Sequence, residues 1–268
     1  MEQTMISELL NLKGRTAIVT GAVGIGFGIS YRLAEAGANV MVASKSLEEA
    51  TDSARKLTEK GWKARGVMCD VSSEEDVKRM VGEAISSFGS VDILVNNAGI
   101  YPSIPVMQMT LSDFEKVLDV NLRGVFLCTK YASEQMVKQG KGGKIINITS
   151  IDALHPSSIG LAHYDASKHG VWGFTKNVAL ELAPHKIWVN AIAPGGILTE
   201  GVKRLQSEHP ATAGADQTKL LERFLEKIPM KRMGEIDDIG KVALFLASDM
   251  SSYMTGSQIV VDGGVLLS

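Results

Sequence analysis

Residues 16–28 read Thr-Ala-Ile-Val-Thr-Gly-Ala-Val-Gly-Ile-Gly-Phe-Gly, an apolar run followed by closely spaced glycines. The run at 16–20 predicts a short strand covered on both faces, and the glycines form a turn before a helix that ends near Gly37. Such a turn lets the backbone approach a pyrophosphate, whose charge meets the free N–H groups at the start of the helix. The candidate dinucleotide-binding residues here are Gly21, Gly24, Ile25 and Gly26. An ordinary glycine-rich turn is the alternative, because Ile29 stands where the generic G-x-G-x-x-G pattern requires its third glycine.

Short apolar runs alternate with longer helical stretches along the rest of the chain. The predicted strands are residues 16–20, 40–43, 64–68, 91–95, 144–149, 188–192 and 258–261. The predicted helices are, in approximate bounds, residues 25–37, 46–60, 73–88, 110–138, 163–183 and 235–248. This alternation predicts one α/β domain, residues 1–268, with a doubly wound, seven-stranded parallel sheet and helices on both faces.

One segment, residues 199–229, breaks the alternation with mixed composition and no clear period. Its length predicts a mobile lid over a substrate site. A surface excursion without function is the alternative.

Composition narrows the class of protein. Of 268 residues, 45% are hydrophobic and 22% are charged, which excludes a disordered chain, a collagen and a coiled coil. The net charge is −2 with scattered Lys and Arg, so a small-molecule partner is favoured over nucleic acid or an anionic membrane. Cys69 and Cys128 form no disulfide or metal motif. No apolar run approaches the roughly 20 residues of a membrane span. Residues 1–12 lack the basic start of a secretory signal peptide. We expect a soluble, cytoplasmic protein without a metal.

Tyr164 and Lys168 lie four residues apart, hence on one face of a helix. A tyrosine must fall from its reference pKa of about 10 towards 7 to act as an acid or base at neutral pH, which costs roughly 4 kcal/mol. A lysine cation supplies part of that, and a positively charged nicotinamide would supply more. Ser150, at the end of the fifth strand, is placed to donate a hydrogen bond to a substrate carbonyl oxygen. For an isolated Tyr-x-x-x-Lys, the alternative is a helix-surface pair.

Further motifs along the chain favour a functional role for the Tyr164–Lys168 pair over a simple helix-surface pair. Asn96-Asn97-Ala98-Gly99 closes the fourth strand, Asn121 lies in an otherwise apolar helix face, and Pro194-Gly195-Gly196-Ile197-Leu198-Thr199 closes the sixth strand. Together with Thr20-Gly21 and the Tyr–Lys pair, they resemble the short-chain dehydrogenase/reductase family in motif type, order and approximate spacing. The resemblance extends from about Leu12 to Gly264, nearly the whole chain.

The resemblance implies a Rossmann fold and an enzyme that transfers a hydride between a nicotinamide cofactor and a carbonyl or secondary alcohol. It implies that Tyr164 is the general acid and base, and that Ser150 positions the same substrate oxygen. Lys168 would lower the tyrosine pKa and bond the nicotinamide ribose, and Asn121 would hold a water that passes protons to Lys168. The further cofactor-binding residues implied are Asp70 and Val71 beside the adenine, then Asn97, Ala98, Gly99, Pro194 and Gly195 along the cofactor, and Ile197 and Thr199 at the carboxamide. An Asn121 that only bonds a carbonyl and an Asp70 that only caps the next helix are the alternatives.

The chain departs from the family pattern at two places. Only Ala22 and Val23 separate Gly21 from Gly24, one residue fewer than in Thr-Gly-x-x-x-Gly-x-Gly. We interpret this as a deletion, in preference to a register that uses Gly26 with Gly28. The stretch from Ser150 to Tyr164 is one residue longer than the commonest spacing, which alters the pocket wall around Asp152, Leu154 and His155.

Cofactor preference depends on the residues after the second strand. Ser44 stands where NAD-linked enzymes place an acid, and Lys45 follows it, so a 2′-phosphate meets a cation and no carboxylate from this position. The glycine loop contributes no second basic residue. We predict a moderate preference for NADP, with residual use of NAD.

The substrate stays open among 3-oxoacyl thioesters, sugars, polyols and cyclic alcohols. The alternatives are an NAD-linked sugar or polyol dehydrogenase and, on the same fold, a nucleotide-sensing protein without catalysis. Asp152, His155 and His163 could face a hydroxylated substrate, although an exposed polar loop is the simpler interpretation. The resemblance also implies a homotetramer, paired through helices around residues 111–137 and 164–182 and through the last strand.

Overall fold

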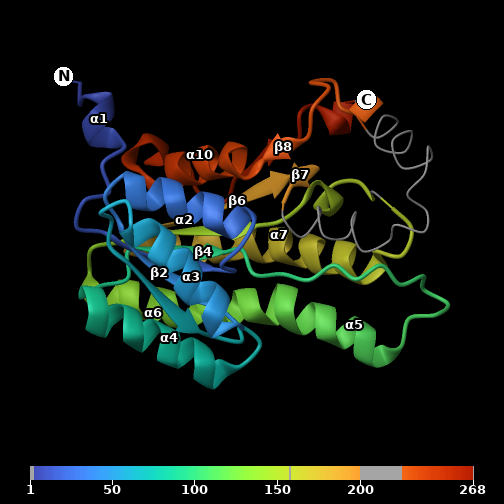
Figure 1. Ribbon diagram of the computed structural model, residues 1–268, viewed down its shortest axis with the longest axis horizontal. Coiled ribbons are helices and arrows are strands. Elements are labelled where there is room, and N and C mark those ends of the chain that lie inside the picture. The colour runs from blue at the N-terminus through green and yellow to red at the C-terminus, as the bar shows by residue number, and fades with distance from the viewer. Residues whose placement is uncertain (1–2, 157, 200–224, 268) are drawn as a thin grey trace.

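The computed structural model describes residues 3–156, 158–199 and 225–267, and its centre is a parallel sheet in the order β3-β2-β1-β4-β5-β6-β9 (Figure 1). The strands are β1 (Thr16–Thr20), β2 (Asn39–Ser44), β3 (Ala64–Met68), β4 (Ile93–Asn96), β5 (Gly143–Ile148), β6 (Ile187–Pro194) and β9 (Gln258–Val261). A separate short pair joins β7 (Ile197–Leu198) to β8 (Gly234–Glu235). The predicted seven-stranded parallel sheet is confirmed.

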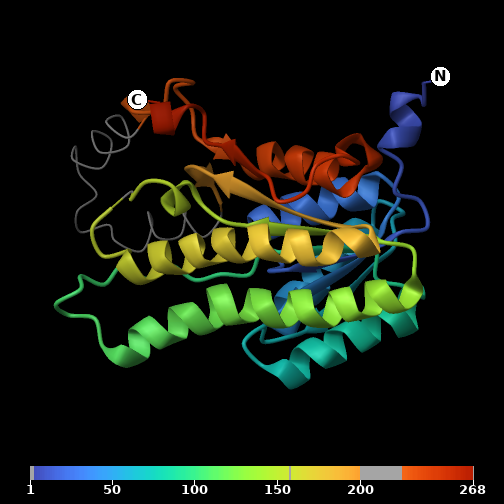
Figure 2. The same cartoon turned by 180° about the vertical axis from the view of Figure 1, so that it is seen from behind.

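Helices cover both faces of the sheet (Figures 1 and 2). They are α1 (Ile6–Leu9), α2 (Ile25–Glu35), α3 (Leu47–Thr58), α4 (Glu74–Phe88), α5 (Leu111–Leu118), α6 (Gly124–Gln139), α7 (Ala162–Leu182) and α10 (Ile236–Ala247). One core, on the side of α2, α3 and α10, contains Leu33, Leu57 and Leu246. The other, on the side of α4, α6 and α7, contains Met80, Met136 and Ala179.

Strand β1 shows why a continuous apolar run predicts these strands better than an alternation of apolar and polar residues does. All five of its residues are buried, and its side chains alternate between the two cores, with Ala17 and Val19 in one and Ile18 in the other. Both faces therefore require apolar or small side chains. Because β1 pairs with both β2 and β4, the strand order reverses there, and the carboxyl ends of β1 and β4 open the crevice where such sheets bind ligands.

The single helix predicted over residues 110–138 is wrong in one respect. The chain forms α5, then one turn of π-helix, η1 (Asp119–Arg123), and then α6. Single π-turns inside helices are rare and occur frequently at functional sites. This one contains Asn121, whose side chain it places against the loop after β4.

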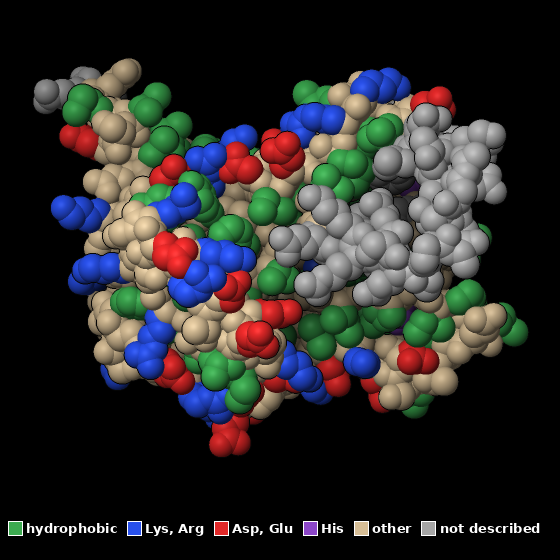
Figure 3. All heavy atoms as spheres, in the orientation of Figure 1, with side chains coloured by type: hydrophobic (Ala, Val, Ile, Leu, Met, Phe, Trp, Pro, Cys, Tyr) green, Lys and Arg blue, Asp and Glu red, His purple; other side chains and the backbone are tan. Residues whose placement is uncertain are grey.

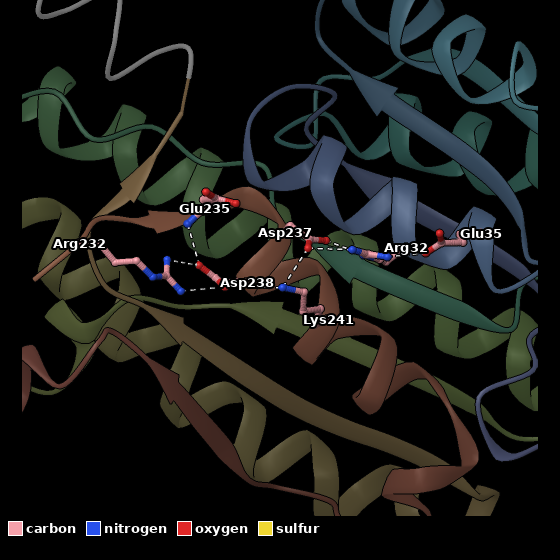
Figure 4. A network of polar contacts seen from close by, with 7 residues as sticks. All are labelled: Arg32, Glu35, Arg232, Glu235, Asp237, Asp238 and Lys241. Atoms are coloured by element: carbon pink, nitrogen blue, oxygen red, sulfur yellow. Dashed lines mark hydrogen bonds and ion pairs between the residues drawn. The ribbon is translucent and has the colours of Figure 1, made fainter. Parts of the chain in front are cut away.

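Helix α2, which follows the glycine loop, is held against α10. A Cβ on Gly28 would lie 2.5 Å from the Ile236 carbonyl oxygen, so only glycine permits this approach. Arg32 on α2 donates two hydrogen bonds to Asp237 on α10, at 2.5 and 2.8 Å (Figure 4). The same figure shows Lys241 beside Asp237, so the contact continues along α10. These contacts place the start of α2 at the sheet's carboxyl edge.

Candidate active site

Thr20 joins the ends of β1 and β4. Its hydroxyl donates to the Val95 carbonyl at 3.3 Å and accepts from the backbone N–H groups of Asn97 and Ala98 at 3.0 and 3.1 Å. The Asn97 side-chain amide donates a hydrogen bond to the Thr20 carbonyl at 2.8 Å. The sequence identified Thr20 only as part of a motif, because its partners are about 75 residues away. The glycine loop and the Asn-Asn-Ala-Gly turn thus form one wall.

The glycine loop has the close backbone packing that a pyrophosphate site requires. Gly21 and Gly24 have φ of 87° and 58°, values that favour glycine, and a Cβ on Gly26 would lie 1.8 Å from the Gly21 carbonyl oxygen. Gly28 faces α10 and lies away from this turn. Gly24 and Gly26 therefore belong to the tight turn and Gly28 to the contact with α10, while the deletion in the loop stays an interpretation.

The first turn of α2 keeps its N–H groups free of a side-chain cap. Helices α3, α4 and α5 are capped by Ser46, Ser73 and Thr110, and each has an acidic residue in its first turn. At α2 the N-cap is Gly24, without a side-chain bond and without an acid in the first turn. Unpaired N–H groups and the positive end of the helix dipole suit an anion such as a dinucleotide pyrophosphate. The residues present therefore fit a dinucleotide cofactor.

Two carboxylates from other parts of the chain lie beside Ser44 and Lys45 at the end of β2. Lys45 is bonded to Asp70 Oδ2 at 2.6 Å, and the Ser44 hydroxyl donates to Glu49 Oε2 at 3.0 Å. Desolvation raises the pKa of Asp70, but hydrogen bonds from Lys45 and Ser72 outweigh it and hold the pKa to about 2. Asp70 does not cap the next helix, a place taken by Ser73 in α4. Val71, its neighbour, is buried against Gly124 at the start of α6.

Ser150, Tyr164 and Lys168 converge at the carboxyl end of β5. The Lys168 ammonium lies 5.5 Å from the centre of the Tyr164 ring, as the four-residue spacing predicts, and donates to the Ile148 carbonyl at 2.7 Å. The Ser150 side chain faces the Tyr164 phenol and lowers its pKa, against the larger effect of burial. Burial lowers the pKa of Lys168 to about 8, against the opposing effect of the Asp152 carboxylate. The hydroxyl groups of Ser150 and Tyr164 thus lie near the buried Lys168 ammonium.

The pKa of Tyr164 differs from the sequence-based expectation. Burial raises it above its usual value, and the Asp152 carboxylate adds to that rise, while the hydrogen bond with Ser150 opposes it. The expected lowering by Lys168 is not found: burial is the largest cause of the shift in the pKa of Tyr164, and the lysine ammonium is bonded to the Ile148 carbonyl. The phenol of the protein by itself is a proton donor at neutral pH.

Asn121 connects the loop after β4 to α7. Its Oδ1 accepts from the Ile100 N–H at 2.8 Å, and its Nδ2 donates to the Ile100 carbonyl at 2.9 Å and to Ser167 Oγ at 3.1 Å. The alternative noted for this residue, a bond to a carbonyl, is therefore present. Its role in a proton relay stays a prediction.

Two polar residues near Tyr164 are buried where the simpler interpretation expects an exposed loop. Asp152 is 6% exposed and His163 is 0% exposed, whereas His155 is exposed. No described residue hydrogen-bonds Asp152 Oδ1 or His163 Nε2. Tyr101, which no sequence motif marks, places its ring edge-on to that of Tyr164, with centroids 6.0 Å apart.

The turn after β6 reaches the glycine loop. Pro194 ends β6, the Gly195 N–H donates to the Val261 carbonyl at 3.0 Å, and Ile197 is buried. A Cβ on Gly24 would lie 3.2 Å from Thr199 Cγ2, so the predicted carboxamide-binding residue sits beside the pyrophosphate turn. Most of the predicted lid, residues 200–224, lies outside the described residues.

Charged side chains elsewhere on the described surface are mixed in sign. Over α2, α3 and α4, Lys and Arg side chains are interspersed with Asp and Glu (Figure 3). No group of acidic, His or Cys side chains in residues 3–156, 158–199 and 225–267 could hold a metal, and no helix there is long and apolar enough to cross a membrane. Cys69 and Cys128 are buried free thiols, and burial raises the pKa of Cys69 to about 12.

The chain is similar to known proteins in both sequence and structure. A family model described as Enoyl-(Acyl carrier protein) reductase matches residues 21–266. The chain is 41% identical over 257 residues to 3-oxoacyl-[acyl-carrier-protein] reductase FabG of Staphylococcus epidermidis, covering 94% of this chain and 99% of that protein. It is 38% identical over 262 residues to short chain dehydrogenase/reductase astE of Aspergillus oryzae, covering 96% and 97%. The crystal structure of a short-chain type dehydrogenase/reductase from Mycobacterium marinum superposes with a TM-score of 0.90 at 38% identity, covering 98% of this chain and 100% of that one.

Proposed function

The chain belongs to the short-chain dehydrogenase/reductase family and is an NAD(P)-dependent oxidoreductase, and from its site we propose that it interconverts a carbonyl group and a secondary alcohol with Tyr164 as general acid and base. The observation that carries this proposal is that Ser150, Tyr164 and Lys168 come together at the carboxyl end of β5, with the Lys168 ammonium 5.5 Å from the centre of the Tyr164 ring. Two hydroxyl donors at one point suit a single oxygen that becomes negative as the carbonyl is reduced.

In the proposed mechanism, Ser150 and Tyr164 both bind the substrate oxygen. When bound, the nicotinamide supplies the hydride to the carbonyl carbon in reduction. Tyr164 gives its proton to the oxygen, a role that suits a phenol whose pKa is raised by burial. Lys168 contributes a positive charge beneath the phenol and, as proposed, bonds the nicotinamide ribose. Asn121 would position a water that returns a proton towards Lys168.

The cofactor would lie along the carboxyl edge of the sheet. We propose that the pyrophosphate binds Gly21, Gly24, Ile25 and Gly26, and that Asp70 and Val71 flank the adenine. Asn97, Ala98, Gly99, Pro194, Gly195, Ile197 and Thr199 would complete the site. In support, the first turn of α2, which has no side-chain cap, lies at this edge. The glycine loop and the Asn-Asn-Ala-Gly turn, which Thr20 joins, lie there too.

For the cofactor we propose a moderate preference for NADP. Lys45 is 83% exposed, and a surface ion pair such as its bond to Asp70 contributes little stability. A phosphate with about two negative charges would compete well for this lysine. Glu49 beside Ser44 works in the other direction, because its carboxylate would accept hydrogen bonds from ribose hydroxyls. We therefore expect the enzyme to prefer NADP and to keep some activity with NAD.

Two substrate classes are candidates for this site. The name of the Staphylococcus relative suggests 3-oxoacyl thioesters, whereas the buried Asp152 favours a more polar substrate, as in an NAD-linked sugar or polyol dehydrogenase. The test is to follow absorbance at 340 nm with NADPH or NADH across keto esters, diketones, sugars and acyl thioesters. Tight dinucleotide binding without turnover of any carbonyl or alcohol would favour a nucleotide-sensing protein instead.

We also propose a cytoplasmic homotetramer. Phe126 on α6 is 45% exposed and Leu180 on α7 is 75% exposed, and these helices are those expected to pair between subunits. Val260 on β9 is 41% exposed at the sheet edge, where the last strand would pair. A monomer by light scattering at micromolar concentration would contradict this assembly.

We propose further that residues 199–229 form a substrate lid on the single domain, residues 1–268. The reason is the length and mixed composition of this segment. Hydrogen exchange of its backbone amides should slow when cofactor and substrate are both bound. Equal exchange in the free and ternary states would reduce the segment to a surface element.

A further inference from the structure

Asp152 is a buried acid beside the reacting groups that the proposed chemistry does not use. It lies in the short 3₁₀ turn η2 (Ile151–Ala153), directly after Ser150, and is 6% exposed. Its backbone N–H donates to Ser150 Oγ at 3.1 Å, which ties its position to the hydroxyl that would bind the substrate oxygen. Its charge acts on both Tyr164 and Lys168. The carboxylate therefore lies close to the place where the substrate would react.

Its carboxylate lacks the partner that burial normally requires. No described residue donates a hydrogen bond to Oδ1, and Lys168, the nearby cation, donates to the Ile148 carbonyl instead. A buried carboxylate oxygen without a donor is costly, and a donor on the substrate would remove that cost. The missing partner is a hydrogen-bond donor.

We propose that Asp152 determines substrate specificity by accepting a hydrogen bond from a hydroxyl group on the carbon next to the one that reacts. The inference rests on the proposed function, because it places the carbonyl oxygen on Ser150 and Tyr164. The backbone of Asp152 is bonded to Ser150 Oγ, so its side chain starts next to the hydroxyl that would bind this oxygen, and we place the neighbouring substrate carbon against its carboxylate. The substrate class is then a 2-hydroxy ketone or the corresponding vicinal diol.

A neutral hydroxyl fits the local charges better than an ammonium group does. Lys168 already places one buried cation in this cluster, so a substrate cation would be repelled by it. A hydroxyl donates to Asp152 without adding charge. Sites built to bind a substrate hydroxyl reject the analogue that lacks it, because the protein group is then left unpaired.

The test compares kcat/KM for pairs of ketones that differ by one hydroxyl group. Suitable pairs are 2-hydroxy-1-phenylethanone with 1-phenylethanone, and 1-hydroxybutan-2-one with butan-2-one. Both members of a pair use the same Tyr164 and Lys168, so a change in those groups cancels in the ratio. We expect wild-type enzyme to favour the hydroxy ketone by about 10- to 100-fold.

Two substitutions separate the hydrogen bond from the charge. Asp152→Ala removes the acceptor, and we expect the ratio to fall to about one. Asp152→Asn keeps the shape and one acceptor oxygen but removes the charge, so the ratio should fall only several-fold, since charge-assisted bonds are roughly twice as strong as neutral ones. This second variant keeps the proposal testable if Asp152→Ala does not fold.

Asp165→Asn is the matched control. Asp165 also acts on Tyr164 by charge and has a buried oxygen without a described partner, but it lies on α7. In this variant the two rates should change together and the ratio should stay within about threefold, because the acceptor at position 152 is intact.

The outcomes are distinct. A wild-type ratio near one, or an equal ratio in wild type and Asp152→Ala, overturns the role of Asp152 and leaves the proposed function standing, because ketones are still reduced. An equal loss of the ratio in Asp165→Asn also overturns it. Absence of turnover with every ketone of the panel overturns both the proposed function and this inference.

Discussion

The Lys168 ammonium donates a hydrogen bond to the backbone carbonyl of Ile148 at 2.7 Å, so the lysine on α7 is fixed to the end of β5. This bond holds a buried cation 5.5 Å from the centre of the Tyr164 ring, and Ser150, two residues after Ile148, lowers the pKa of the same phenol. The lysine is therefore a buried cation held in a fixed position beside the Tyr164 ring.

The pH dependence of ketone reduction should follow Lys168. Burial lowers the pKa of Lys168 to about 8, so its charge is present at pH 7 and lost as pH rises, while Tyr164, with a raised pKa, stays protonated. We expect kcat/KM for reduction to fall through one ionisation near pH 8. Lys168→Arg keeps its charge and should move the fall to higher pH. A wild-type profile that is flat to pH 9.5 would contradict this assignment.

Tyr164→Phe should remove the proton donor and leave the ring packing against Tyr101 nearly unchanged. Because general acid catalysis typically contributes about 10²–10⁴-fold, turnover should fall by about that factor with little change in dinucleotide affinity. Turnover is measured at 340 nm and affinity by fluorescence titration. A variant that keeps more than roughly a third of wild-type turnover would remove Tyr164 from the mechanism.

Lys45→Ala should weaken NADPH binding about ten- to one-hundred-fold and leave NADH almost unaffected, because only NADPH carries the phosphate. Asp70→Asn should act in the opposite direction on NADPH, since it releases Lys45 from its ion pair. Ser44→Asp should invert the preference. Lys78→Ala, which removes another exposed lysine paired with Glu74, is the control and should change neither affinity. An equal loss for both cofactors in Lys45→Ala would make this lysine an ordinary surface residue.

Gly28→Ala should destabilise the protein, because its Cβ would lie 2.5 Å from the Ile236 carbonyl oxygen and force α2 away from α10. We expect a loss of about 1–3 kcal/mol, measured by thermal or urea unfolding. Gly82→Ala in α4 is the matched control, because a Cβ there meets no atom within 4 Å, and it should be neutral or slightly stabilising. Equal effects in the two variants would show that the α2–α10 approach does not limit stability.

Lys144→Met should change stability in a pH-dependent way. Lys144 is 3% exposed, its ammonium lies 4.2 Å from the centre of the Trp188 ring, and burial lowers its pKa from 10.5 to about 8. Between these values the unfolded chain binds more protons, so this lysine makes stability rise with pH from about 8 to 10.5. The advantage of Lys144→Met in melting temperature should therefore be largest at pH 7 and shrink above pH 8. A constant difference from pH 7 to 10 would contradict this.

The sequence by itself determined the sheet, the helices that cover it and the family, because these depend on local periods and on motifs a few residues long. The apolar runs, the Tyr164–Lys168 spacing and the glycine turn are all of this kind. Each can be recognised without knowing what lies across the fold. The order of the motifs along the chain then placed Ser150, Tyr164 and Lys168 in one site.

Only the tertiary structure decided the environment of those residues. Burial and contacts between distant segments raise the pKa of Tyr164, leave Asp152 Oδ1 without a described partner and place Glu49 on Ser44. The side chain of Asn121, in the π-turn, likewise bonds Ile100, 21 residues away. Desolvation and hydrogen bonding act through space, and neither follows the local period of a sequence.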